Sequence, residues 1–119
     1  MVLLVEDEPL IVAVVEDALQ EAGFAVTVAA DGEEAQAALL SGLPFQGLLV
    51  DINLPGSLSG WDLARMARTQ LPQIAVVYAT GHGEQEWPAE GVPNSALVSK
   101  PYAPAQAITA LSQQLNTAG

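Results

Sequence analysis

The chain has no cysteine among its 119 residues, which excludes disulfide bridges and thiolate metal sites. Basic residues are also scarce, with three Lys and Arg against 14 Asp and Glu and a formal net charge of −11. Because nucleic acids and anionic membrane surfaces bind basic faces, we expect neither as a direct partner. No run of about 18 apolar residues occurs, and no basic region precedes an apolar one at the N-terminus. These absences favour a cytoplasmic protein.

Half of the residues are hydrophobic, which is enough for a well-formed core. A chain of this length builds one such core and is too short for two. We therefore expect residues 1–119 to form a single domain.

Short apolar runs alternate five times with longer stretches of helical period. The runs are residues 2–5, 25–29, 47–50, 74–79 and 95–99. They are too apolar to present a water-facing side, as is typical of parallel strands buried on both faces. The alternation predicts an α/β fold in which a parallel sheet is built from βαβ units.

Helix signals lie between the runs. A first helix is expected from Pro9 to Gly23, with Asp7 or Glu8 available as its cap. Its apolar repeat consists of Leu10, Ile11, Val14, Val15, Ala18 and Leu19.

Three further helices are expected, and another, between the fourth and fifth apolar runs, is doubtful. Asp31 caps one that runs to Gly42, Ser59 and Asp62 resemble a capping box, and the last helix follows Pro104. Residues 81–94 contain two prolines and three glycines. We expect at most a weak or short helix there, because proline and glycine disfavour helix interiors.

Polar residues follow four of the apolar runs. They are Glu6 and Asp7, then Asp51, then Thr80 and Gly81, and finally Lys100. Ligands of open α/β sheets bind outside the carboxyl ends of the strands, so these residues form the candidate site. Carboxylates suit Mg²⁺, while a hydroxyl and an ammonium suit a phosphoryl group.

Four motifs in the chain resemble one known family. They are "VEDEP" (5–9), "LLVDINLPG" (48–56), "ATG" (79–81) and "SKPY" (99–102). In this order and approximate spacing, they resemble the receiver domains of two-component response regulators over essentially the whole chain. The resemblance implies a doubly wound, flavodoxin-like sheet of five parallel strands in the order 2-1-3-4-5.

The resemblance also implies roles for the candidate residues. Asp51 is the phosphoacceptor, supplied by a sensor histidine kinase or a histidine phosphotransfer protein. Mg²⁺ is held by Asp7, Asp51, the backbone carbonyl of Asn53 and, through water, Glu6. Thr80, Gly81 and Lys100 bind the phosphoryl group. Such a domain gains and loses its own phosphoryl group rather than turning over a substrate, and it acts on an unknown output protein or as a phosphate sink.

Three positions modify this expectation. Leu97 stands where receivers commonly carry an aromatic switch residue, so the usual aromatic rotation is not expected. The segment 51–60 is one residue longer than the common loop, and with "YATGH" (78–82) it resembles the FATGUY group of single-domain receivers, which lack an output domain. Asn53 and His82 correspond to positions that flank the attacking water, where they tune dephosphorylation; alternatively, His82 is a solvated loop residue.

Two other classes of function remain open from the residues. A Mg²⁺-dependent phosphohydrolase with an aspartyl-phosphate intermediate would want a second aspartate two positions after Asp51, where this chain has Asn53. A nucleotide-binding flavodoxin-like protein would want a glycine-rich loop after a strand, and none is present.

Overall fold

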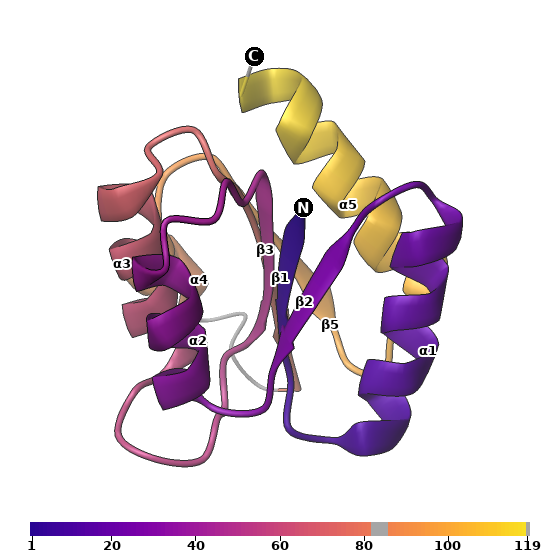
Figure 1. Ribbon diagram of the computed structural model, residues 1–119, viewed down its shortest axis with the longest axis horizontal. Helices are drawn as coiled ribbons and strands as arrows, with labels where there is room; N and C mark the ends of the chain where they lie inside the picture. Colours follow the sequence, from indigo (N-terminus) through magenta and orange to yellow (C-terminus); the bar gives the residue numbers. More distant parts are fainter. Residues whose placement is uncertain (82–85, 119) are drawn as a thin grey trace.

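The computed structural model describes residues 1–81 and 86–118, in which strands and helices alternate along the chain (Figure 1). The strands are β1 (Val2–Val5), β2 (Val26–Ala29), β3 (Gly47–Asp51), β4 (Ala75–Thr80) and β5 (Ser95–Ser99). The helices are α1 (Pro9–Glu21), α2 (Gly32–Leu40), α3 (Gly60–Gln70), α4 (Trp87–Glu90) and α5 (Pro104–Ala118). Each strand lies within one residue of its predicted bounds. No helix in these two ranges is both long and apolar enough to cross a membrane.

The five strands form one parallel sheet in the order β2-β1-β3-β4-β5. Helices α2 and α3 cover one face of the sheet, and α1 and α5 cover the other (Figure 1). We call these the α2/α3 face and the α1/α5 face. This arrangement confirms the doubly wound fold expected from the sequence.

Each central strand contributes side chains to both faces. In β1, Leu3 and Val5 pack under the α2/α3 face, whereas Val2 and Leu4 pack under the α1/α5 face. All four are at most 1% exposed. Burial on both sides explains why the strand reads as a continuous apolar run rather than an alternating one.

Helix α1 has the predicted period but a narrower buried face than its apolar repeat suggests. Val15 and Leu19 are buried, whereas Leu10 is 84% exposed and Val14 is 56% exposed. The apolar repeat of the sequence is therefore wider than the buried stripe of the helix. A helix buries only the stripe that its neighbours cover, and the sequence does not show how wide that stripe is.

Helix α4 has only four residues, which confirms the short fourth helix expected from its prolines and glycines. Side chains hold it and the turn after it in place. The indole of Trp87 donates to the hydroxyl of Ser95 at 3.0 Å. From α3, Arg65 pairs with Glu90 at 2.7 Å, and Arg68 donates to the carbonyls of the loop before β5.

Tyr78 links β4 to this same segment from inside the core. Its ring is fully buried, with its centroid 4.6 Å from that of Trp61, and burial raises the pKa of its phenol. The phenol oxygen accepts a hydrogen bond of 3.0 Å from the backbone N–H of Val92. Tyr78 therefore ties the turn after α4 to the centre of the sheet.

Replacing Tyr78 by Phe is expected to lower the free energy of unfolding by about 2 kcal/mol, because it leaves the buried N–H of Val92 without its acceptor. Urea denaturation monitored by circular dichroism measures the change. Tyr102→Phe is the matched control, because it removes the same hydroxyl from a residue that is only half-buried. Equal midpoints for the two variants would contradict this role for Tyr78.

Candidate functional site

The carboxyl ends of the strands bring the polar residues to one edge of the sheet. Glu6 and Asp7 follow β1, Asp51 ends β3, and the neighbouring β4 ends at Thr80. One carboxylate oxygen from each of Glu6, Asp7 and Asp51 lies within 4.8 Å of the others. The three predicted carboxylates therefore form a single acidic cluster.

Lys100 joins this cluster from the end of β5. Its ammonium lies 2.8 Å from Oδ2 of Asp51 and 3.0 Å from Oε1 of Glu6. These two carboxylates are only 5% and 2% exposed, respectively, so the ion pairs are largely shielded from water. The backbone N–H of Lys100 also donates to the carbonyl of Thr80 at 2.7 Å, which fixes the chain beside β4.

The charges of the cluster shift one another's titration. Burial raises the pKa of Glu6, and the charge of Asp51 adds to the increase, while the hydrogen bond from Lys100 opposes it. Burial alone would lower the pKa of Lys100, but its hydrogen bonds with Asp51 and Glu6 outweigh that effect and raise the pKa overall. The site therefore keeps a protonated lysine between two carboxylates.

Glu6 also organises the start of α1. Its Oε2 accepts hydrogen bonds from the backbone N–H groups of Asp7 and Glu8 at 3.0 and 3.2 Å. Glu8 occupies the N-cap position, but its side chain makes no capping hydrogen bond. Glu8 is therefore the N-cap residue, one of the two candidates expected from the sequence, while the buried Glu6 carboxylate binds the backbone N–H groups just before the helix.

Asp51 is held by the loop that follows it. Its Oδ1 accepts from the backbone N–H of Asn53 at 3.0 Å, and the N–H of Ile52 donates to Ala79 on β4 at 3.0 Å. The loop closes where the N–H of Gly60 donates to the carbonyl of Ile52 at 3.1 Å. A Cβ atom on Gly60 would lie 2.6 Å from the carbonyl oxygen of Asp51, so only glycine fits at this point.

Helix α3 starts directly after this closure. Ser59 and Asp62 form the predicted capping box, with each side chain bonded to the other residue's backbone N–H. Hydrogen bonds from the backbone N–H and the hydroxyl of Ser59 to the Asp62 carboxylate lower the pKa of Asp62. The capping box confirms the start of this helix as predicted from the sequence.

The remaining predicted site residues have different environments. Thr80 is fully buried at the end of β4, whereas Gly81 and Asn53 are exposed. Leu97 pairs in register with Tyr78 and packs, half-buried, against the α2/α3 face. His82 lies outside the described residues.

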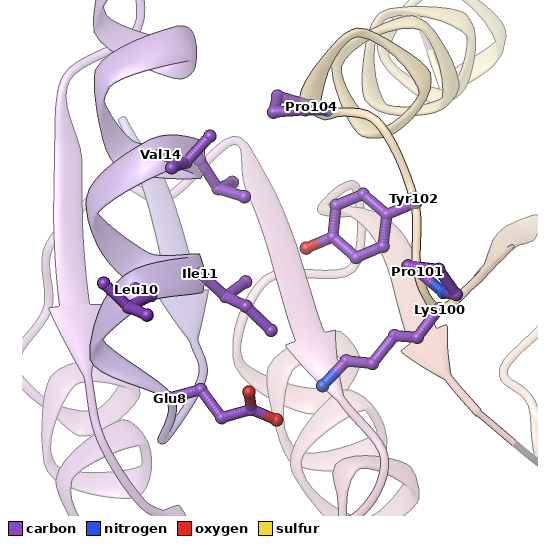
Figure 2. Close-up of a pocket in the computed structure, with 9 residues that line it drawn as sticks. Glu8, Leu10, Ile11, Val14, Lys100, Pro101, Tyr102 and Pro104 are labelled. Carbon is purple, nitrogen blue, oxygen red and sulfur yellow. The ribbon is translucent and has the colours of Figure 1, made fainter.

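A groove beside the cluster escaped the sequence analysis. It has a volume of about 480 Å³ and runs between α1 and the connection from β5 to α5 (Figure 2). Its lining consists of Glu8, Leu10, Ile11, Val14, Val15, Lys100, Pro101, Tyr102 and Pro104. Figure 2 shows the Tyr102 ring pointing toward α1, and burial raises the pKa of this tyrosine to about 12. Leu10 and Val14 of α1, which are exposed rather than in the core, line this groove.

Fold and site together define a doubly wound α/β domain with an acidic centre at the carboxyl edge of its sheet. A family model described as the response regulator receiver domain matches residues 2–112. The chain therefore belongs to the receiver domains of response regulators.

Individual relatives agree with this family. The nitrogen assimilation regulatory protein NtrX of Azorhizobium caulinodans is 31% identical over 104 residues, which are 85% of this chain and 23% of that protein. The transcriptional activator protein ExaE of Pseudomonas putida is 34% identical over 119 residues, which are 96% of this chain and 54% of ExaE. The chain thus spans about half or less of either relative.

Solved structures share the whole fold. A response regulator receiver protein from Sinorhizobium medicae has a TM-score of 0.95 and 40% identity, and the match covers 99% of this chain and 95% of that one. The receiver domain of a sensor histidine kinase from Pseudomonas aeruginosa has a TM-score of 0.81 and 26% identity, covering 97% and 96% of the two chains. That second structure has a magnesium ion coordinated in its active site cleft.

Proposed function

We propose that this receiver domain works in a two-component phosphorelay in which Asp51 accepts a phosphoryl group from a phosphohistidine. The donor is a sensor histidine kinase or a histidine phosphotransfer protein. The observation that carries the proposal is the buried Asp51 carboxylate, which lies within the acidic cluster and binds Lys100 at 2.8 Å. In the transfer, a carboxylate oxygen of Asp51 forms a bond to phosphorus as the bond from phosphorus to the imidazole nitrogen breaks. The electron pair of the broken bond returns to the imidazole.

The donor set of the acidic cluster fits a magnesium ion. It offers three carboxylate oxygens within 4.8 Å of one another, and hard divalent cations prefer oxygen ligands. Asp7, Asp51 and the backbone carbonyl of Asn53 would hold the ion. Glu6 would act through water, since its two oxygens already bind Lys100 and the backbone N–H groups of Asp7 and Glu8. When bound, the ion offsets the repulsion between these carboxylates and the phosphoryl oxygens.

Lys100, Thr80 and Gly81 would bind the transferred group. The Lys100 ammonium already contacts the oxygen atom Oδ2 of Asp51, so it lies where new phosphoryl oxygens would appear. Thr80 ends the strand next to β3 and can donate its hydroxyl to the same group. Asn53 and His82 would tune the later attack of water.

The groove in Figure 2 is a suitable contact surface for the donor protein, because it adjoins the edge that the phosphohistidine must reach. Leu10 and Val14 supply exposed apolar area there. The signal then passes to an output protein by direct contact, or the domain serves as a phosphate sink. Direct contact with nucleic acid is not part of this proposal, given the net charge of −11.

The test is incubation with a small phosphodonor such as acetyl phosphate and Mg²⁺, followed by intact-mass measurement. A receiver gains one phosphoryl group per chain, and the gain is lost when EDTA replaces Mg²⁺. Sustained release of phosphate from added phosphomonoesters would instead favour the phosphohydrolase. Asn53 disfavours the phosphohydrolase, because an amide cannot serve as the general acid that such an enzyme needs.

Magnesium is expected to raise the melting temperature of the parent protein, and Asp7→Ala is expected to remove most of that increase. An ion that binds only the folded state stabilises it by about 2.7 kcal/mol at 100 times its dissociation constant. Differential scanning fluorimetry with and without MgCl₂ measures the shift. Asp17→Ala removes another exposed acid of the α1 region and should respond like the parent. Equal shifts in Asp7→Ala and the parent would contradict this metal site.

A further inference from the structure

The loop between β3 and α3 contacts the start of α2. Leu58, near its end, lies against Gly32 at the start of α2. A Cβ atom built on Gly32 would be 2.6 Å from the Cβ of Leu58, which is much shorter than the ordinary contact distance of 3.4–4 Å. The two backbones therefore approach each other more closely than a side chain at position 32 would allow.

The contact with α2 extends along the loop. The hydroxyl of Ser57 donates to Oε1 of Glu33 at 3.4 Å, and a Cβ atom on Gly56 would lie 3.0 Å from the other carboxylate oxygen of Glu33. Leu54 and Leu58 also pack, half-buried, against the α2/α3 face. The loop thus contacts the start of α2, although residues 55–57 remain exposed.

The two ends of the loop meet beside the acidic cluster. Gly60 lies against the carbonyl of Asp51 and bonds to Ile52, and the capping box at Ser59 fixes the chain just before it. At the first end of the loop, the N–H of Asn53 donates to the carboxylate of Asp51. A displacement of Leu58 is therefore expected to be transmitted through these contacts to Asn53 and Asp51.

We propose that Gly32 is a positioning residue for the phosphoacceptor site, acting through Leu58 to set where Asn53 and Asp51 lie. The proposal rests on the function proposed above for Asp51. It explains why the first helical residue of α2 is a glycine, although almost any other residue favours a helix more. Gly32 itself touches neither the metal ligands nor the phosphoryl group.

Gly32→Ala is the direct test. The added methyl group must move Leu58 by about 1 Å, a misplacement that can slow a positioned reaction about 100-fold. Part of the strain can relax, so we expect about a tenfold loss of Mg²⁺ affinity and of the phosphorylation rate. Calorimetric titration with MgCl₂ gives the affinity, and intact-mass time courses with acetyl phosphate give the rate. Both are measured below the unfolding transition, where a purely structural effect would not change them.

Three further variants separate positioning from general damage. Leu58→Gly removes the side chain that contacts α2 and should also weaken Mg²⁺ binding. Ala37→Gly, on the exposed side of α2, lowers helix stability and should leave affinity and rate at parental values. In the double variant Gly32→Ala with Leu58→Gly, the clashing Cβ is gone, so the combined loss should be smaller than the sum of the two single losses.

The outcomes divide clearly. A tenfold loss in Gly32→Ala, parental behaviour in Ala37→Gly and a non-additive double variant support the positioning role. Parental affinity and rate in Gly32→Ala overturn it, as do strictly additive losses. If the parent itself shows neither Mg²⁺ binding nor phosphorylation, the proposed function fails instead, which is a different result.

Discussion

Asp51→Asn is expected to acquire no phosphoryl group under conditions that modify the parent completely. An amide keeps the shape of the carboxylate and can still accept the hydrogen bond from Lys100, but it has no nucleophilic oxygen for phosphorus. Intact-mass spectra after exposure to acetyl phosphate and Mg²⁺ report the result directly. Mg²⁺ should also bind the variant more weakly, because one of the three clustered carboxylates is lost.

The fold of Asp51→Asn should survive, which makes the variant informative. Removing one negative charge relieves its repulsion with the buried Glu6, whose ion pair with Lys100 at 3.0 Å remains. Asp17→Asn provides a matched control on the exposed surface of α1 and should be modified like the parent. A phosphoryl adduct on Asp51→Asn would place the acceptor on another residue, which peptide mapping would identify.

Lys100→Met is expected to lower the free energy of unfolding by about 3 kcal/mol when Mg²⁺ is absent. The variant leaves the carboxylates of Glu6 and Asp51 buried side by side without their cation, which is the costly way to break a buried ion pair. Mg²⁺ should then restore much of the lost stability, and it should bind more tightly than in the parent because no ammonium competes for the same oxygens. Urea denaturation with and without MgCl₂ measures both effects.

The Lys100→Met deficit should depend on pH with a defined sign. The pKa of Glu6 is already raised above its ordinary value of 4.5 by burial, and loss of the ammonium raises the pKa further. A group with a raised pKa binds its proton more readily in the folded state, so folding loses stability as the pH rises through that pKa. The deficit should therefore be full at neutral pH and shrink as the pH falls and Glu6 becomes protonated. Lys100→Arg keeps the cation and should retain most of the stability; an equal deficit in both variants would contradict the charge argument.

The sheet and its order could be anticipated because their signals are local and strong. Each strand is a short run buried on both faces, and each long helix begins at a proline or a capping residue. The candidate carboxylates were predictable for a related reason, since parallel strands all end at one edge. The extent of the buried stripe on α1 was not, because the helical period is the same whether Leu10 and Val14 contact the core or line a groove.

The contacts that escaped prediction join residues far apart in the chain. Tyr78 and Val92 are separated by 14 positions, and nothing in either residue type indicates that one binds the other. Gly32 reads as an ordinary helix start after Asp31, with no sign of the loop that packs on it. Glu6 is the exception, because its hydrogen bonds to the backbone N–H groups of Asp7 and Glu8 are local; its residue type and position indicate only a metal ligand.

The positions of the three cationic residues determine how the surface looks to an approaching molecule. Lys100 is bound within the acidic cluster, Arg65 bridges to Asp62 and Glu90, and Arg68 donates to backbone carbonyls. All of the Lys and Arg charge is thus engaged in internal contacts, while most of the 14 acidic side chains face water. The net charge of −11 gives the domain a negative long-range field. Such a field accelerates encounters with positively charged partners at low ionic strength, keeps identical copies apart, and fades beyond about 8 Å at physiological salt.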